Sequence, residues 1–353
     1  MPENIQIEKH ETVKNTLKKL DKTAEKVLLV VDRRKKLLGT ITDGDIRRFV
    51  LSGGNLDSKI DTIYNTSPIC VRKKNFSLDN AKKLLISNKI ELIPIVQENN
   101  MVVDFITWSQ AFSKGRIFNL NNKINEQVVI MAGGRSTRLE PFTKILPKPL
   151  IPIGDKPIIE IIIDRFKEYG ILDYYLILNY KADLIESYFN NIDKDYRITS
   201  IREDSFRGTA GGLSLLKNRV EDCFIVSNCD VIVNADFCDV LEFHKKNRAF
   251  LTILSSFQHY KIPYGVVKFT EGGRVVDIIE KPEHTCTVNT GVYIMNKECL
   301  DYIPEGAHFD ITDLIKELIN NKKEIFTYPV NENDYIDIGQ WDEYKKAIEK
   351  MRF

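Results

Sequence analysis

The sequence has no long apolar segment. Its apolar runs, such as Val27–Val31, extend over only a few residues, whereas a helix needs about 20 apolar residues to span a bilayer. The first ten residues, MPENIQIEKH, also lack the apolar region of a secretion signal. We therefore expect a cytoplasmic protein with no membrane partner.

Closely paired cysteines are missing as well. The six cysteines are Cys70, Cys223, Cys229, Cys238, Cys286 and Cys299. No two of them have the CxxC spacing that is typical of a structural zinc site. Reduced thiols in a reducing compartment are the expectation.

The chain has almost no net charge, because its 353 residues include 51 Lys and Arg and 50 Asp and Glu. This balance hides an asymmetry, since residues 1–125 carry 22 basic and 14 acidic side chains. A basic N-terminal part suits an anionic ligand, although an ordinary solvated surface would have the same charge. The remainder is acidic, which argues against nucleic acid as a partner. Length and the apolar content of 43% indicate two soluble globular domains.

An internal repeat occupies the N-terminal part. Val27–Val31 aligns with Leu92–Val96 at an offset of 65 residues, and Ile41-Thr42 aligns with Ile106-Thr107 at the same offset. Each copy has the pattern of a helix, a short apolar strand, a turn, a second strand and a further helix. So small a unit cannot bury both faces alone, so the two copies should pack on each other.

Polar residues 121–126 separate this repeat from a region in which strand and helix patterns alternate. We expect strands at 128–131, 174–178 and 223–227, and helices at 157–169, 181–190 and 209–218. Such alternation predicts a mostly parallel α/β sheet with crossover helices. Ligands of these sheets bind beyond the carboxyl ends of the strands.

A glycine turn with fixed positive charge follows the strand at 128–131. Gly133 and Gly134 let backbone N–H groups approach an anion without interference from a Cβ atom. Arg138 and Lys148 then add two cations, and three prolines near Lys148 restrict its backbone. A polyphosphate needs this combination of donors and charge. The segment has neither the GK[ST] of a Walker A loop nor GxGxxG.

Further motifs follow in order: Gly208–Gly212, Ser227–Asp230, Tyr264–Val267, Glu280–Pro282, Asn289–Tyr293 and Asp337–Gly339. With the glycine turn, they make residues 126–353 resemble the sugar-1-phosphate nucleotidylyltransferases, the pyrophosphorylases that make nucleotide sugars. The resemblance implies a Rossmann-like mixed-sheet domain. It also implies in-line attack of a sugar phosphate on the α-phosphorus of a nucleoside triphosphate, with pyrophosphate leaving.

The resemblance assigns roles to single residues. Arg138 and Lys148 would stabilise charge on the triphosphate, and Lys281 would contact the sugar phosphate. Asp230 and Asp337 would hold Mg²⁺. The nucleotide-binding residues would further include Ala132, Gly133, Gly134, Gly208 and Thr209. The sugar-phosphate pocket would further include Tyr264, Gly265, Glu280, Asn289 and Thr290.

Base choice is expected at Glu203, which in the family faces the Watson–Crick edge of the base. An ionised carboxylate only accepts hydrogen bonds. Guanine offers two adjacent donors, whereas uracil and thymine offer one donor flanked by carbonyl groups. This favours GTP, although the adjacent Asp204 leaves the register open by one residue.

One departure from the family pattern concerns the sugar phosphate. Some members carry an arginine shortly before a segment like Asp310–Asp313, but residues 304–308 contain none. The contact with the sugar phosphate must therefore differ. His308 is a candidate for it, although a lone histidine is more often structural.

Residues 1–122 resemble a tandem pair of cystathionine-β-synthase-type (CBS) modules. In that family, Thr42 and Asp45 of a T-x-x-D pattern contact the phosphate and ribose of an adenine nucleotide. The second copy has Gln110 in place of the aspartate. The pair would thus regulate the enzyme or only dimerise it, and both alternatives stay open. We expect a homo-oligomer.

A CBS pair before such a domain resembles in particular the glucosamine-1-phosphate guanylyltransferases of legionaminic acid synthesis. GTP and glucosamine 1-phosphate are therefore the expected substrates. The alternatives are guanylyl transfer to mannose 1-phosphate or a manno-heptose 1-phosphate, and uridylyl or thymidylyl transfer. A non-catalytic sensor of a nucleotide sugar would keep the same fold, but the presence of both aspartates and both basic residues favours the enzyme.

Overall fold

The computed structural model describes residues 2–23, 27–88, 90–112, 123–330 and 332–350. The chain divides into two compact units, Met1–Gly115 with His259–Cys286 and Arg116–Gln258 with Thr287–Phe353. This division differs from the predicted domains, 1–122 and 126–353, because residues 259–286 group with the N-terminal unit. Residues 121–122 of the predicted linker lie outside the described ranges. No helix within those ranges combines the length and apolar character that crossing a bilayer requires.

The N-terminal unit contains the predicted repeat. The first copy consists of η1 (Pro2–Ile5), β1 (Gln6–Glu8), α1 (Val13–Thr23), β2 (Val27–Val31), β3 (Leu37–Thr42) and α2 (Asp43–Leu51). The second consists of β4 (Val71–Arg72), η2 (Lys73–Asn75), α3 (Leu78–Asn88), β5 (Leu92–Val96), β6 (Val102–Thr107) and α4 (Trp108–Phe112). In each copy the first strand runs parallel to the second, and the second and third form a hairpin. Both hairpins even shift register at equivalent positions, Val30/Val31 and Ile95/Val96.

The two copies meet through equivalent residues. Lys36 bridges to Met101, the residue 65 positions later. On either side of this bridge, Leu37 N–H donates to Asn100 O at 2.9 Å and Val102 N–H donates to Lys35 O at 3.0 Å. Val96 and Val102 also join the apolar core of the first copy. The prediction that the copies pack on each other is confirmed.

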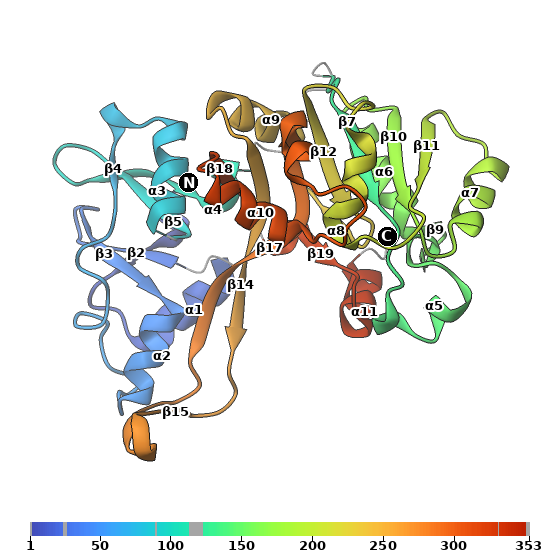
Figure 1. Ribbon diagram of the computed structural model, residues 1–353. Coiled ribbons are helices and arrows are strands. Elements are labelled where there is room, and N and C mark those ends of the chain that lie inside the picture. Colours follow the sequence, from blue (N-terminus) through green and yellow to red (C-terminus); the bar gives the residue numbers. More distant parts are fainter. Residues whose placement is uncertain (1, 24–26, 89, 113–122, 331, 351–353) are drawn as a thin grey trace. The chain divides into compact units, whose positions relative to one another are not determined.

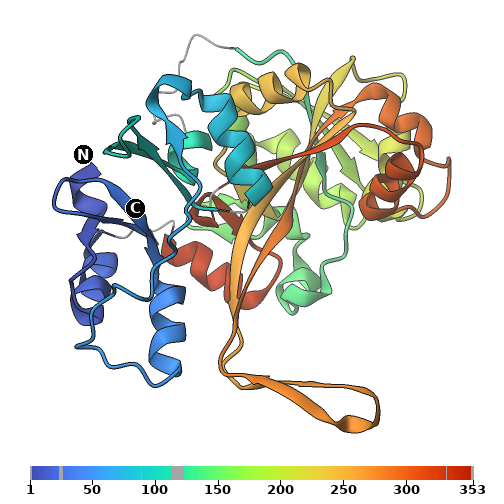
Figure 2. The ribbon, with the colours of Figure 1, turned by 90° about the vertical axis from the view of Figure 1, so that its left-hand side faces the viewer.

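The second unit is built on a seven-stranded sheet (Figures 1 and 2). In spatial order its strands are β11 (Arg197–Arg202), β10 (Asp173–Leu178), β7 (Gln127–Met131), β12 (Cys223–Asn228), β17 (Glu283–Asn296), β14 (Leu251–Lys261) and β18 (Ile325–Val330). The first four are parallel, β17 is antiparallel to β12, and β14 is parallel to β18. The expected α/β class is confirmed.

Helices surround this sheet: α5 (Phe142–Ile145), α6 (Ile158–Lys167), α7 (Ala182–Asn191), α8 (Gly208–Gly211), α9 (Phe237–Lys246), α10 (Ile311–Asn320) and α11 (Trp341–Lys350). The 3-10 turns are η3 (Thr137–Leu139), η4 (Lys148–Leu150), η5 (Gly212–Leu216), η7 (Lys297–Tyr302) and η8 (Glu332–Asp334). Short pairs complete the unit, namely β8 (Pro152–Ile153) with β9 (Lys156–Pro157) and β13 (Val231–Val233) with β19 (Tyr335–Asp337). The predicted strands, and the predicted helices at 157–169 and 181–190, are confirmed to within two residues of each end.

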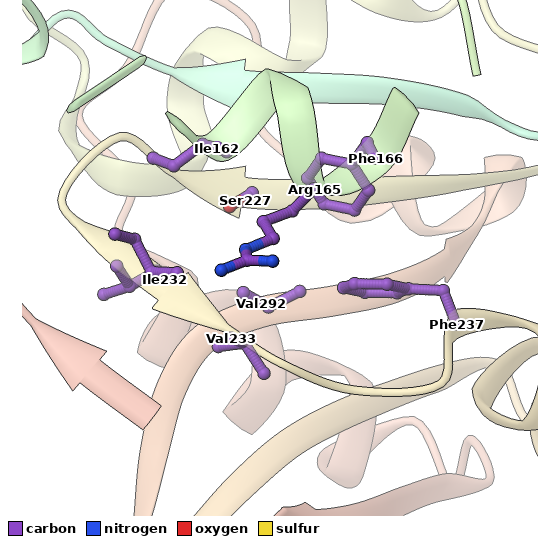
Figure 3. A pocket seen from close by; sticks show the side chains of 9 residues that line it. Ile162, Arg165, Phe166, Ser227, Ile232, Val233, Phe237 and Val292 are labelled. Atoms are coloured by element: carbon purple, nitrogen blue, oxygen red, sulfur yellow. The ribbon is translucent and has the colours of Figure 1, made fainter. Parts of the chain in front are cut away.

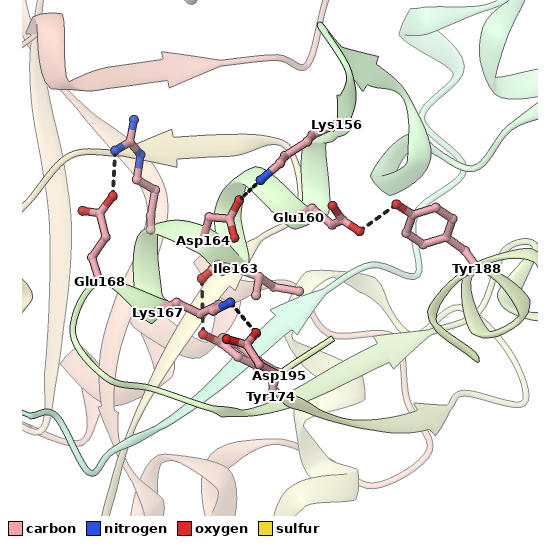
Figure 4. Close-up of polar contacts among 10 residues, drawn as sticks. Lys156, Glu160, Ile163, Asp164, Lys167, Glu168, Tyr174, Tyr188 and Asp195 are labelled. Atoms are coloured by element: carbon pink, nitrogen blue, oxygen red, sulfur yellow. Dashed lines mark hydrogen bonds and ion pairs between the residues drawn. The ribbon is translucent and has the colours of Figure 1, made fainter. Parts of the chain in front are cut away.

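Helix α6 is fixed by its apolar face and by two tyrosines (Figure 4). Six of its ten side chains are buried apolar residues. Tyr188 Oη donates to Glu160 Oε1 at 2.7 Å, and Tyr174 Oη reaches Ile163 O at 3.3 Å. The ion pair of Lys156 with Asp164 is exposed, so it adds little to stability.

The predicted helix at 209–218 forms differently. A four-residue α8 passes directly into the 3-10 turn η5. Glycines are poor helix formers, and the first backbone N–H groups are engaged elsewhere. Ala210 and Gly211 N–H both donate to Phe309 O, at 3.0 and 2.9 Å.

Thr209 and Asp310 hold this turn against the start of α10. Thr209 N–H and Thr209 Oγ1 both donate to Asp310 Oδ1, at 2.9 and 3.1 Å. In return, Thr209 Oγ1 accepts the N–H of Ile311 at 2.9 Å. Gly208, at a φ of +82°, has no room for a side chain, since a Cβ would lie 2.7 Å from Phe309 O. The Gly208–Gly212 motif is thus anchored by a segment a hundred residues later.

We expect Asp310→Ala to loosen the Gly208–Gly212 turn, because it leaves the Thr209 donors without their acceptor at a cost of about 1–3 kcal/mol. Hydrogen-exchange mass spectrometry should show faster exchange of the amides at 208–212. Asp313→Ala removes a carboxylate of the same helix whose only side-chain partner among the described residues is Lys316, at 3.4 Å, and it should leave these amides unchanged. Equal protection in both variants would contradict the anchoring role.

Candidate active site

Two of the predicted motifs, the glycine turn and the segment that leads to Asp230, lie where two neighbouring parallel strands end. Met131, the last residue of β7, lies opposite Asn228, the last residue of β12. The glycine turn after β7 and the segment that leads to Asp230 therefore leave the sheet at the same edge. This is the edge at which α/β sheets bind ligands.

The glycine turn presents unused backbone donors. Ala132 N–H donates to Ile177 O, and Gly133 O accepts from Tyr180 N–H, so one side of the turn is fixed. Within the described residues, the N–H groups of Gly133–Ser136 donate to no protein acceptor. A Cβ on Gly134 would meet nothing within 4 Å, so the turn faces open space. Consecutive free N–H groups of this kind form an anion-binding concavity.

Lys148 brings a buried positive charge to the same edge. Its side chain is 5% exposed and forms an ion pair with Asp230 Oδ2. The 3-10 turn η4 holds it, with Ile151 N–H donating to Lys148 O at 3.0 Å. A charge so deeply buried is costly without such a partner.

Asp337 lies beside Asp230, as the motifs predicted. Strands β13 and β19 pair Val231 with Asp337, and Ile338 N–H donates to Asp230 O at 2.8 Å. A Cβ on Gly339 would lie 2.8 Å from Asp337 Oδ1 and 3.6 Å from Asp230 Oδ2, so both carboxylates face this glycine. Burial raises the pKa of Asp337, and the nearby Asp230 carboxylate raises it further, while the Gly339 N–H and Lys148 oppose the rise.

Two crowded carboxylates of this kind suit a divalent cation. Mg²⁺ prefers oxygen ligands and is usually bound by one or two carboxylates, with substrate phosphates and water completing its shell. Within the described residues, no group of three or more candidate ligands occurs. Asp230 and Asp337 have the ligand chemistry of a Mg²⁺ site, and that they hold the ion stays a prediction.

Glu203 is buried between two glycine turns. Only 6% of it is exposed, and a Cβ on Gly133 or Gly212 would lie 2.8 or 2.7 Å from its carboxylate oxygens. Burial raises the pKa of Glu203, and a hydrogen bond from Arg207 N–H at 3.3 Å lowers it. Asp204, whose side chain is 98% exposed, points to solvent. Of the two acids that the sequence left open, Glu203 is the one beside the glycine turn.

The other predicted residues of this unit have internal roles as well. Asn289 Nδ2 donates to Tyr293 Oη at 2.6 Å, and Thr290 Oγ1 donates to Leu254 O at 2.8 Å. Next to them in β17, Gly291, at a φ of +84°, packs against Asn228. This close approach sets Asn289 and Thr290 beside the end of β12. Arg138 is exposed and forms no ion pair within the described residues.

Four predicted residues lie in the other unit. The hairpin of β15 (Val266–Phe269) and β16 (Val275–Ile279) is flanked by Tyr264, Gly265, Glu280 and Lys281. Lys281 N–H donates to Tyr264 O at 3.3 Å, and a Cβ on Gly265 would lie 3.0 Å from Glu280 Oε2. These four residues lie close together at the base of the hairpin. Their contact with a sugar phosphate stays a prediction.

His308, the candidate for a sugar-phosphate contact, is exposed. Its ring lies edge-on to Phe206, with 6.0 Å between the centroids.

Thr42 and Asp45 form a capping box at the start of α2. Asp45 N–H donates to Thr42 Oγ1 at 3.2 Å, and Asp45 Oδ2 accepts from both the N–H and the hydroxyl of Thr42. Thr107 and Gln110 repeat this arrangement in the second copy. The T-x-x-D pattern of the first copy and the Thr107–Gln110 pair of the second therefore both have a structural role, and contact of Thr42 and Asp45 with an adenine nucleotide stays a prediction.

A small cavity is lined by residues of α6, β12 and β13 (Figure 3). The guanidinium of Arg165 points into it, between Ser227 and Val233. Its volume of about 10 Å³ is close to the space of a single water. It is too small for a substrate.

Sequence reasoning missed the residues that only shape the site. Gly339, Gly291 and Asp310 are part of motifs already noted, but their roles follow from contacts with distant residues. Gly339 is the clearest case, since any side chain there would fill the space that the two carboxylates face.

Comparisons with known proteins agree with this geometry. The family model "Nucleotidyl transferase" matches residues 127–352, and the CBS domain model matches residues 1–52. The UTP–glucose-1-phosphate uridylyltransferase of Synechocystis is 30% identical over 243 residues, which cover 63% of this chain and 62% of that protein. A mannose-1-phosphate guanyltransferase of Yarrowia lipolytica is 31% identical over 223 residues, covering 60% of each. The chain thus spans about three fifths of the length of these relatives.

Among solved structures, HddC from Yersinia pseudotuberculosis is similar to the second unit. It is 27% identical with a TM-score of 0.52, and the match covers 64% of this chain and all of that one. A second structure of HddC is a complex with GMP-PN. The family model covers more than half of the chain, so the chain belongs to the nucleotidyl transferase family, with a CBS domain at its N-terminus.

Proposed function

We propose that the chain transfers a nucleotidyl group from a nucleoside triphosphate to a sugar 1-phosphate and releases pyrophosphate. One observation carries the proposal: four unused backbone N–H groups lie at the sheet edge that holds Lys148, Asp230 and Asp337. The nucleotidyl transferase family and its sugar-1-phosphate relatives support it.

The reaction needs positioning and neutralisation of charge more than covalent help. A phosphate oxygen of the sugar 1-phosphate forms a bond to the α-phosphorus, and the bond from that phosphorus to the bridging oxygen of the leaving pyrophosphate breaks. The N–H groups of the glycine turn would bind the triphosphate. Arg138 and Lys148 would stabilise the negative charge that develops on the leaving group.

Asp230 and Asp337 would hold Mg²⁺, which when bound draws charge from the phosphate oxygens and aligns them. The protein keeps the two carboxylates together through the β13–β19 pairing. Gly339, which has no side chain, leaves open the space that both carboxylates face. Lys148 pairs with Asp230, so its ammonium group lies at the edge where the phosphates would bind.

We further propose GTP as the nucleotide, because Glu203 is a buried acceptor beside the glycine turn. Ionised, it would accept from the two adjacent donors of guanine. The named relatives include both uridylyl and guanylyl enzymes, so family membership does not choose the base. Glucosamine 1-phosphate is the proposed sugar substrate, because the domain arrangement resembles that of the glucosamine-1-phosphate guanylyltransferases of legionaminic acid synthesis. Mannose 1-phosphate and a manno-heptose 1-phosphate are the alternatives.

A matrix of nucleoside triphosphates against sugar 1-phosphates, with pyrophosphate release as the readout, tests the proposal. The expected maximum is GTP with glucosamine 1-phosphate. A maximum at another pair would correct the base or the sugar. No release from any pair in the presence of Mg²⁺ would favour a non-catalytic sensor.

Removing one charge from the acidic pair should nearly abolish turnover. Asp230→Asn and Asp337→Asn each weaken the hold on the cation, and we expect kcat to fall on the order of 100-fold or more. Asp301→Asn, at an exposed position in η7, is the matched control and should keep full activity. Near-normal kcat in either site variant at saturating Mg²⁺ would refute the metal assignment.

Base preference should depend on Glu203 and on pH. Burial raises the pKa of this carboxyl, so it protonates earlier than an ordinary glutamate as the pH falls. The protonated form loses its acceptor role, and the ratio of kcat/KM for GTP to that for UTP should fall at acidic pH. In Glu203→Gln the ratio should be lower than in the wild type, by a factor that corresponds to about 1–3 kcal/mol. It should also be independent of pH. A wild-type ratio that is flat with pH, or that favours UTP, would contradict this role.

A further inference from the structure

The first CBS copy has a hollow of about 320 Å³ at one edge of its sheet. Strands β1 and β2 are parallel, and Glu8 lies opposite Val31. The residues that follow β1 and those that follow β2 therefore lie at the same end of the sheet. Four cations line the hollow: Lys9, Arg33, Arg34 and Lys36, with His10 beside them.

These four cations have no acidic partner in the part of the chain that the structure describes. Two carboxylates also line the hollow. Asp32 Oδ1 accepts the backbone N–H groups of Arg34 and Lys36, at 2.8 and 2.9 Å, so it shapes the turn between β2 and β3. Glu8 is exposed and forms no ion pair within the same residues. The hollow therefore has four cations against two carboxylates, and its net charge is positive.

The second copy shows that the fold does not require this charge. Its equivalent turn has Glu98, Asn99 and Met101 where the first copy has Arg33, Arg34 and Lys36. There, Glu98 pairs with Lys74 at 2.7 Å. Arg72 donates to Gln97 O and to Asn100 Oδ1, each at 2.7 Å. The same edge is thus closed by internal contacts in one copy and left open and basic in the other.

The hollow is separate from the T-x-x-D pattern. Thr42 lies opposite Val27, at the start of β2, whereas the hollow lies at the end of that strand. Its ligand would therefore not use the capping box of Thr42 and Asp45.

We propose that this hollow binds an oligophosphate, that is, two or more linked phosphate groups. Guanidinium groups bind phosphate oxygens through paired, charge-assisted hydrogen bonds. Four cations spread over about 320 Å³ match several phosphates better than one, and the volume lies within the range of small-molecule sites. Inorganic polyphosphate and the phosphate chain of a nucleotide share this chemistry.

The test uses the full chain and tripolyphosphate in EDTA, so that no metal takes part. Hydrogen-exchange mass spectrometry should show protection of residues 8–11 and 31–37 on addition of the ligand, independently of any protection at the glycine turn. Arg33→Glu/Arg34→Asn introduces the residues of the second copy into the first. It should remove that protection and raise the Kd of this site at least about tenfold in calorimetry.

Lys18→Ala/Lys22→Ala is the matched control, because it removes two exposed lysines of α1 in the same copy. It should leave both readouts unchanged. ATP and GTP, added in competition, identify the source: displacement of tripolyphosphate assigns a nucleotide, and no displacement assigns an inorganic chain. Protection confined to the glycine turn, or equal loss in the control, would overturn the proposal whether or not the enzyme turns over substrate.

Discussion

The ion pair between Lys148 and Asp230 is the interaction on which the site depends. The buried ammonium group of Lys148 needs a charged partner, which is the partly buried carboxylate of Asp230, and Asp337 lies directly beside that carboxylate. One positive and two negative charges therefore share a small volume and none is fully neutralised. The backbone pairing of β13 with β19 and the hydrogen bond from Ile338 N–H to Asp230 O keep the two carboxylates together.

The fold places these charged groups at the ends of its strands. β7 and β12 are neighbours in parallel register, so the glycine turn and Asp230 meet without any long loop. The β13–β19 pair brings Asp337 from more than a hundred residues away. Cys229, next to Asp230, is not a candidate nucleophile, because burial raises the pKa of its thiol to about 12. The site is thus suited to direct transfer between two bound phosphates.

The local sequence pattern was enough to predict the strands, two of the helices and the repeat. β7, β10 and β12, for example, are runs of consecutive, mostly apolar residues that are visible in the sequence. The motifs also paired Asp230 with Asp337 correctly. Sequence could not show that the N–H groups of Ala210 and Gly211 are used by Phe309, nor that Thr42 and Asp45 satisfy each other. These features depend on contacts between residues far apart in the chain or on side-chain geometry, which pattern does not encode.

The stereochemical course at the α-phosphorus tests the central claim most directly. Direct in-line transfer between two substrates held by Lys148, Asp230 and the glycine turn involves one displacement. With a nucleoside triphosphate whose α-phosphorus carries sulfur in one configuration, ³¹P NMR of the nucleotide-sugar product should therefore show inversion. Retention would require two displacements through a covalent intermediate on the protein, and it would contradict the account.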